Sequence, residues 1–78
     1  GRILLYPNPN KDRFSLANVD LKKFQELRIY NMQGKLVEFN YDFNGENIDV
    51  HHQLSAGAYF LEFVYINGEN KRMKFIVR

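Results

Sequence analysis

The sequence contains no cysteine, which excludes disulfide bonds, thiol catalysis and thiolate metal sites. A chain of 78 residues without disulfides must fold by burying apolar side chains alone. There is no tryptophan and there are only two prolines. No apolar run approaches the roughly 20 residues of a transmembrane helix. The net charge of +2 is too weak to indicate a nucleic-acid or membrane-surface partner.

Apolar side chains are nevertheless plentiful, at 45% of the sequence with seven Phe and five Tyr. Large aromatic rings bury much area per residue, which suits the small core of a single short domain. This content, together with the low net charge, argues against disorder.

Hydrophobic residues alternate with polar ones along most of the chain. Phe14 and Leu16 share one face of "RFSLA", and Ile48 and Val50 share one face of "NIDVH". Such a period of two is typical of strands that are buried on one face. The pattern predicts seven strands, over residues 3–6, 13–17, 26–32, 35–43, 46–51, 58–66 and 71–77. Short strands separated by frequent turns indicate an all-β fold, a single antiparallel β-sandwich.

Turn signals separate these strands. Asn44-Gly45 and Asn67-Gly68 predict hairpins, Gln33-Gly34 predicts a third turn, and residues 55–57 predict a further break. The segment 20–27 fits two structures, because its apolar residues are spaced by three and Asp20 is placed as an N-cap. A single helical turn and a plain loop are both consistent with it.

The stretch "LLYPNPNKDRFSL" begins as a strand and is then interrupted. Pro7 and Pro9 have no N–H, so they cannot lie in a central strand ladder. We therefore predict a short edge strand followed by a stiff corner. Such a corner either leads the chain from one sheet to the other or caps an edge against further pairing.

No residue pattern indicates catalysis or a metal site. His51 and His52 are adjacent, so on a strand they face opposite sides and we expect them to be surface residues at a strand end. Residues 42–49 place acids and amides around a glycine, but not at the spacing of a calcium loop. Ser15 and Ser55 lack the partners of a catalytic triad. We expect no enzyme activity, no cofactor and no small-molecule substrate.

Aromatic residues leave one alternative function open. We expect Tyr30, Tyr41 and Tyr65 to lie on the strand faces opposite the core residues. An outward aromatic platform would fit an accessory carbohydrate-binding module. Cross-strand pairing that stabilises a thin sandwich explains the same residues.

The C-terminal stretch "KRMKFIVR" holds four basic residues and no acid. Its alternation predicts a last strand with a basic outer face. Basic edge strands protect against aggregation, and they also suit docking of a partner by charge or by strand addition. The sequence is consistent with both.

Four stretches in this order, "LYPNP", "LRIYNMQGKLV", "LSAGAYFLEF" and "KRMKFIVR", resemble the C-terminal sorting domain of the type IX (Por) secretion system, over residues 4–78. The resemblance implies a seven-stranded immunoglobulin-like sandwich at the C-terminus of a larger secreted protein. Residues 1–78 would then be one sorting domain, with its cargo domain upstream in the same parent chain. The implied partners are the outer-membrane translocon, a shuttle and a sortase-like peptidase. The implied location is the periplasm in transit, then the cell surface or the extracellular space.

The resemblance also implies which residues form the sorting motif. The matching positions are Tyr6, Pro7, Asn8, Pro9, Gly34, Lys35, Gly57, Tyr59, Lys74, Phe75, Val77 and Arg78.

Overall fold

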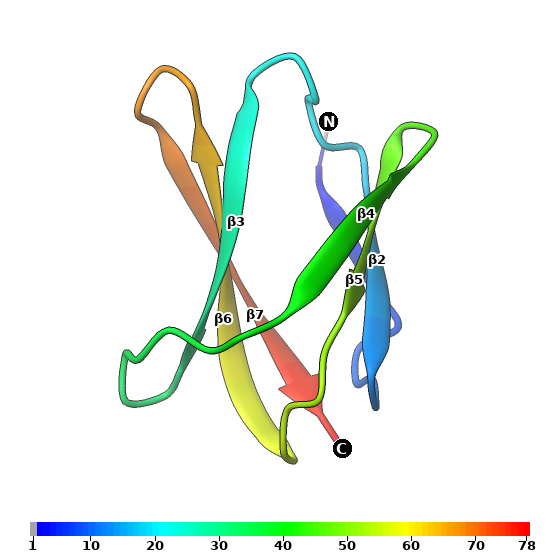
Figure 1. The fold of residues 1–78 in the computed structure, drawn as a ribbon, viewed down its shortest axis with the longest axis vertical. Coiled ribbons are helices and arrows are strands. Elements are labelled where there is room, and N and C mark those ends of the chain that lie inside the picture. The colour runs from blue at the N-terminus through cyan, green and yellow to red at the C-terminus, as the bar shows by residue number, and fades with distance from the viewer. Residues whose placement is uncertain (1) are drawn as a thin grey trace.

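The computed structural model describes residues 2–78, and its regular elements are seven β-strands (Figure 1). They are β1 Leu4–Tyr6, β2 Arg13–Ala17, β3 Phe24–Asn31, β4 Asn40–Asn44, β5 Asn47–His51, β6 Gly57–Tyr65 and β7 Asn70–Val77. Across residues 2–78 there is no helix with the length and apolar character needed to cross a membrane.

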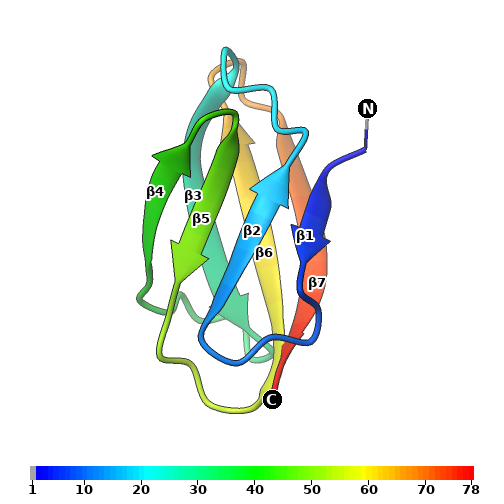
Figure 2. The same cartoon turned by 90° about the vertical axis from the view of Figure 1, so that its right-hand side faces the viewer.

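The strands form two antiparallel sheets that face each other (Figure 2). One sheet has the order β1-β2-β5-β4 and the other the order β3-β6-β7. In the strand letters of immunoglobulin domains these orders are ABED and CFG, the constant-type arrangement. The predicted all-β, immunoglobulin-like sandwich is confirmed.

The core lies between the sheets and consists mostly of the side chains that the alternation selects, with Ile3 and Val19 added from outside the strands. Phe14 and Leu16 contribute from β2, and Phe75 contributes from β7 on the opposite sheet. The rings of Phe14 and Phe75 lie 4.8 Å apart and join the two layers. Burying each such side chain contributes about 1.5–3 kcal/mol.

The predicted strand over 35–43 is partly wrong. Only residues from Asn40 onward pair in β4, while Leu36 makes an isolated bridge to Tyr30 of β3. The chain between these points crosses from one sheet to the other (Figure 1). Val37 and Phe39 still pack against the core, and the N–H of Val37 donates to the carbonyl of Ile29 at 2.9 Å. The alternation therefore predicted the burial of both residues correctly, but the pairing with β3 ends before Phe39 and no continuous strand covers 35–43.

The segment after β2 forms a turn and no helix. Asp20 organises it, because its carbonyl accepts the N–H of Lys23 at 3.1 Å and its Oδ1 accepts the N–H of Lys22 at 3.2 Å. β3 begins directly afterwards at Phe24. Of the two structures that the sequence allowed, the loop is the correct one.

Candidate functional site

The proline corner links the two sheets. After β1 the chain passes Pro7 and Pro9, both preceded by cis peptide bonds, and reaches the outer edge of β7. There the N–H of Asn10 donates to the carbonyl of Ile76 at 3.0 Å, and the N–H of Arg78 donates to the carbonyl of Asn10 at 2.9 Å. This is a parallel bridge of Asn10 with Val77. The corner therefore pairs with the edge of the second sheet at Asn10, the capping role that was predicted, before β2 returns the chain to the sheet of β1.

Asn8 extends this contact with its side chain. Its Oδ1 accepts the N–H of Ile76 at 2.9 Å, in the place where a main-chain carbonyl of a parallel strand would stand. Asn10, which carries the main-chain bonds, is 2% exposed. The first and last of the four sequence stretches, although far apart in the chain, are thus bonded to each other.

Tyr59 lies at the start of β6 and makes a tyrosine corner. Its hydroxyl donates to the carbonyl of Ser55 at 2.8 Å, the bond that fixes this turn in immunoglobulin-like sandwiches. Gly57, two residues earlier, has a φ of +155°, which L-residues with a side chain rarely adopt. The tyrosine hydroxyl and the glycine of the third stretch are therefore both required by the conformation of the turn before β6.

The same residues pair with the terminal strand. Tyr59 lies opposite Phe75, and Gly57 lies opposite Val77. The rings of Tyr59 and Phe75 stack at 5.8 Å with an interplanar angle of 25°. The third stretch is thus in direct contact with the fourth.

Gly34 and Lys35 form the turn that follows β3. Gly34 has a φ of +81°, and the Oδ1 of Asn31 accepts the N–H groups of Gln33 and Lys35 at 2.9 and 3.0 Å. Asn31 pairs with Tyr59 of β6, so this turn lies at the same end of the sandwich as the other three stretches (Figure 1). We call this region the motif end and define it by residues 6–10, 31–35, 55–59 and 74–78.

Exposure divides the predicted motif residues into two groups. The side chains of Tyr59, Phe75 and Val77 are buried in the core. The residues that face solvent are Tyr6, Pro7, Asn8, Pro9, Gly34, Lys35, Gly57, Lys74 and Arg78. A partner can touch only this second group, whereas the first group shapes the fold.

The prediction that His52 is a surface residue is wrong. His52 is 5% exposed, and its Nε2 lies 2.6 Å from the Oδ1 of Asn10. Its Nδ1 accepts the N–H of Leu54 at 3.2 Å, so the proton of the neutral ring must lie on Nε2, which donates to Asn10. Burial lowers the pKa of His52, and the charge of Asp12 opposes this in part. Nothing local in the sequence marks this contact.

Glu62 was also not identified from the sequence as a buried charged residue. It is 7% exposed on the outer face of the β3-β6-β7 sheet, where it accepts a bond from the Tyr30 hydroxyl at 3.1 Å. Arg72 Nε lies 3.4 Å from Glu62 Oε2, and Arg28 Nη1 lies 3.8 Å from Glu62 Oε1. The Arg72 guanidinium also lies 5.1 Å above the Tyr30 ring. The predicted basic outer face of the last strand is therefore tied into the sheet at Arg72.

The aromatic platform expected from Tyr30, Tyr41 and Tyr65 is not formed. Tyr65 is 7% exposed, because it shares the inward face of β6 with Phe63, and Tyr41 packs against the core. Tyr30 faces outward but lies beneath Arg72. A flat aromatic surface for sugar stacking is therefore absent at these three positions.

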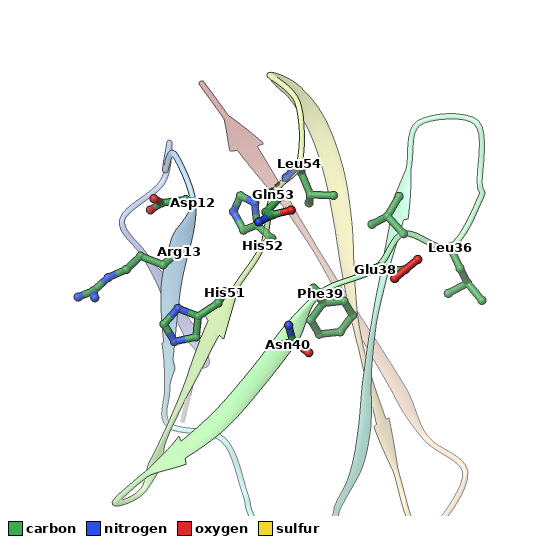
Figure 3. A pocket seen from close by; sticks show the side chains of 11 residues that line it. Asp12, Arg13, Leu36, Glu38, Phe39, Asn40, His51, His52, Gln53 and Leu54 are labelled. Atoms are coloured by element: carbon green, nitrogen blue, oxygen red, sulfur yellow. Dashed lines mark hydrogen bonds between the residues drawn. The ribbon is translucent and has the colours of Figure 1, made fainter.

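An open depression of about 900 Å³ lies between the loops that follow β3 and β5 (Figure 3). His51 and Arg13, from neighbouring strands, stand on one side, and Phe39 belongs to the chain that crosses between the sheets. Within residues 2–78 no group of three His, Asp or Glu side chains is placed to hold a metal ion. The lining offers mixed polar groups without a nucleophile and base in contact.

Comparison with known proteins assigns the chain to a family. No curated protein matches the chain. The family described as "Secretion system C-terminal sorting domain" matches residues 4–78, nearly the whole sequence. The chain therefore belongs to the C-terminal sorting domains of the type IX secretion system, non-catalytic domains that serve as signals for secretion across the outer membrane.

Proposed function

We propose that residues 1–78 are the C-terminal sorting domain of a larger secreted protein and that the secretion machinery reads the motif end. The cargo lies upstream in the same parent chain. The readers are the outer-membrane translocon, a shuttle protein and a sortase-like peptidase. The domain passes through the periplasm and then reaches the cell surface or the extracellular space.

One observation carries this proposal: the proline corner is hydrogen-bonded to the terminal strand. Three bonds hold the two segments together: the N–H of Ile76 donates to Asn8, the N–H of Arg78 donates to Asn10, and the N–H of Asn10 donates to Ile76. They fix exposed side chains from both ends of the sequence in one arrangement. A partner that binds a rigid surface loses less conformational entropy than one that must order it.

The domain also meets the physical needs of a sorting signal. Because it has no cysteine, it reaches its folded state without an oxidation step. Its buried side chains form one core between two sheets, so the surface is set by the fold itself. The turn at Gly34 and the tyrosine corner at Tyr59 hold the remaining loops of the motif end.

The test is export of a fluorescent protein that carries a periplasmic signal and residues 1–78 at its C-terminus, in a host with this secretion system. Deleting residues 74–78 is unsuitable, because it removes Phe75 and Val77 from the core. The variant Lys74→Glu with Arg78→Glu reverses charge at two exposed positions and leaves the core intact.

The matched control is Lys22→Glu with Lys23→Glu. These lysines are also exposed, but they lie by the turn after β2, next to the β6–β7 hairpin at the other end of the sandwich. We expect surface fluorescence to be lost for the first pair and retained for the control. Equal export of both variants would contradict the assignment of the motif end as the surface that is read.

A further inference from the structure

The outer edge of β7 carries main-chain groups that point away from β6. Ile76 and Arg78 show the direction, since their N–H groups are bonded to the proline corner on that side. Main-chain groups along a strand alternate between its two edges. The N–H and C=O groups of Arg72 and Lys74 therefore point to the same outer edge. Within residues 2–78, no hydrogen bond satisfies these four groups.

The edge is open because the N-terminal strand belongs to the other sheet. β1 is hydrogen-bonded to β2 and forms the edge of the β1-β2-β5-β4 sheet. The chain reaches β7 only after the prolines, where Asn10 bridges Val77. Parallel pairing on β7 thus begins at its C-terminal end and stops at the Asn8 side chain.

A groove of about 400 Å³ runs along this open part of the edge. It is lined by Arg2, Ile3, Lys71, Arg72 and Met73. Ile3 and Met73 are buried or partly buried and supply an apolar floor, whereas Arg2 and Lys71 are exposed. The carboxylate of Glu62 lies 3.4 Å from Arg72 and pairs with it, whereas Asp20 and Glu69 line a separate depression that shares Ile3 and Lys71 with the groove.

We propose that β7 accepts an extended acidic segment of a partner protein as an additional strand along Arg72–Lys74. The four open main-chain groups supply the ladder, and such strand addition is a common mode of peptide recognition. Arg2, Lys71 and Lys74 supply positive charge for acidic side chains on the added strand. The inference rests on the proposed function only in placing that segment on the secretion machinery.

Charge also selects against a second copy of this chain. The strand that a second copy would offer, β7 itself, carries Lys71, Arg72 and Lys74 and no acid between them. Like charges that lie opposite each other across paired strands are destabilising. Basic residues on an edge are a common protection against self-association. The occupant of this edge is therefore acidic and comes from another protein.

The first test is amide hydrogen exchange measured by NMR on residues 1–78, with a capped peptide of alternating Val and Glu as the probe. We expect the peptide to slow exchange of the Arg72 and Lys74 amides. The Ile76 amide, already bonded to Asn8, is the internal control and should not change. A capped peptide of alternating Val and Lys should protect neither amide.

Two variants of Lys74 separate the contribution of main-chain hydrogen bonding from that of charge. Lys74→Pro removes one outward N–H, a change that an edge strand tolerates because the ladder to β6 is untouched. Lys74→Gln removes the charge and keeps the N–H. Relative to Lys74→Gln, we expect Lys74→Pro to weaken binding of the acidic peptide about fivefold further, the effect of one hydrogen bond. Equal affinities for these two variants would overturn the strand-addition geometry, as would equal protection by the Val–Lys peptide.

The export assay distinguishes this inference from the proposed function. If the acidic peptide protects Arg72 and Lys74 but the wild-type fusion is not exported, the proposed function fails and the edge site stands. If the fusion is exported but the acidic peptide protects neither amide, the edge site fails and the proposed function stands.

Discussion

The Nε2 of His52 lies 2.6 Å from the Oδ1 of Asn10, in a buried contact that spans 42 positions of the sequence. Asn10 in turn is bonded through its main chain to Ile76 and Arg78. The imidazole therefore supports the residue that joins the proline corner to the terminal strand. Because Nδ1 accepts the N–H of Leu54, a second proton on the ring would place two donors face to face.

We predict that acid weakens the fold through His52. Burial lowers its folded pKa below the ordinary value of 6.5, so the unfolded chain binds a proton first as the pH falls. The contribution of His52 to the free energy of unfolding should be constant above pH 6.5. It should decrease as the pH falls from 6.5 to the folded pKa of His52, because in this range the unfolded chain binds more protons than the folded chain. Urea unfolding at a series of pH values measures this slope.

His52→Gln removes the titrating ring, and His51→Gln is the matched control because His51 is exposed. The slope should disappear in the first variant and persist in the second. The lowered pKa of Asp49, which accepts a bond from Ser15, affects stability only below the ordinary value of 3.8. A slope near neutrality that persists in His52→Gln would refute the role of His52.

A second prediction concerns the bond from Asn8 to the terminal strand. Asn8→Ala removes the acceptor of the Ile76 N–H and should speed exchange of the Ile76 amide about fivefold, as expected for loss of about 1 kcal/mol. The amide of Arg78, which bonds to the main chain of Asn10, is the internal control. If both amides accelerate equally, the whole edge has opened and the side chain of Asn8 has no separate role.

The alternation of the sequence predicted which side chains are buried better than it predicted which residues pair. Phe39 and Tyr41 both pack against the core, yet only Tyr41 lies in a paired strand. A side chain can reach the core from an unpaired extended segment, and the period of two is the same in both cases. The pattern therefore could not predict where β4 begins.

Two residues whose burial was not predicted, Tyr65 and His52, differ in their cause. The alternation itself places Tyr65 on the same face as Phe63, so the pattern was clear and the expected exposure of Tyr65 was an error of interpretation. His52 differs, because its burial depends on Asn10 and on the path of the proline corner. The prolines predicted a corner, but the strand that it meets is fixed only by the packing of the two sheets.

A third prediction tests the tyrosine corner. Tyr59→Phe removes the hydroxyl that donates to the Ser55 carbonyl and keeps the ring that stacks on Phe75. We expect the free energy of unfolding to fall by about 1 kcal/mol. Tyr6→Phe, at a residue that is 46% exposed, should leave it unchanged. Equal losses in the two variants would mean that the Tyr59 hydroxyl does not stabilise this turn.

The last prediction concerns Arg72, which pairs with Glu62 and covers Tyr30. Arg72→Ala should lower the free energy of unfolding by about 1–2 kcal/mol, because it leaves a largely buried carboxylate with the more distant Arg28 and removes a cation from an aromatic ring. In the Glu62→Gln background the same change should cause a smaller loss, since no charge is then left unpaired. A double-mutant cycle from urea unfolding gives the coupling, which we expect to be about 0.5–1 kcal/mol. A coupling of zero would assign the whole effect of Arg72 to its contact with the ring, because that contact is present in both backgrounds.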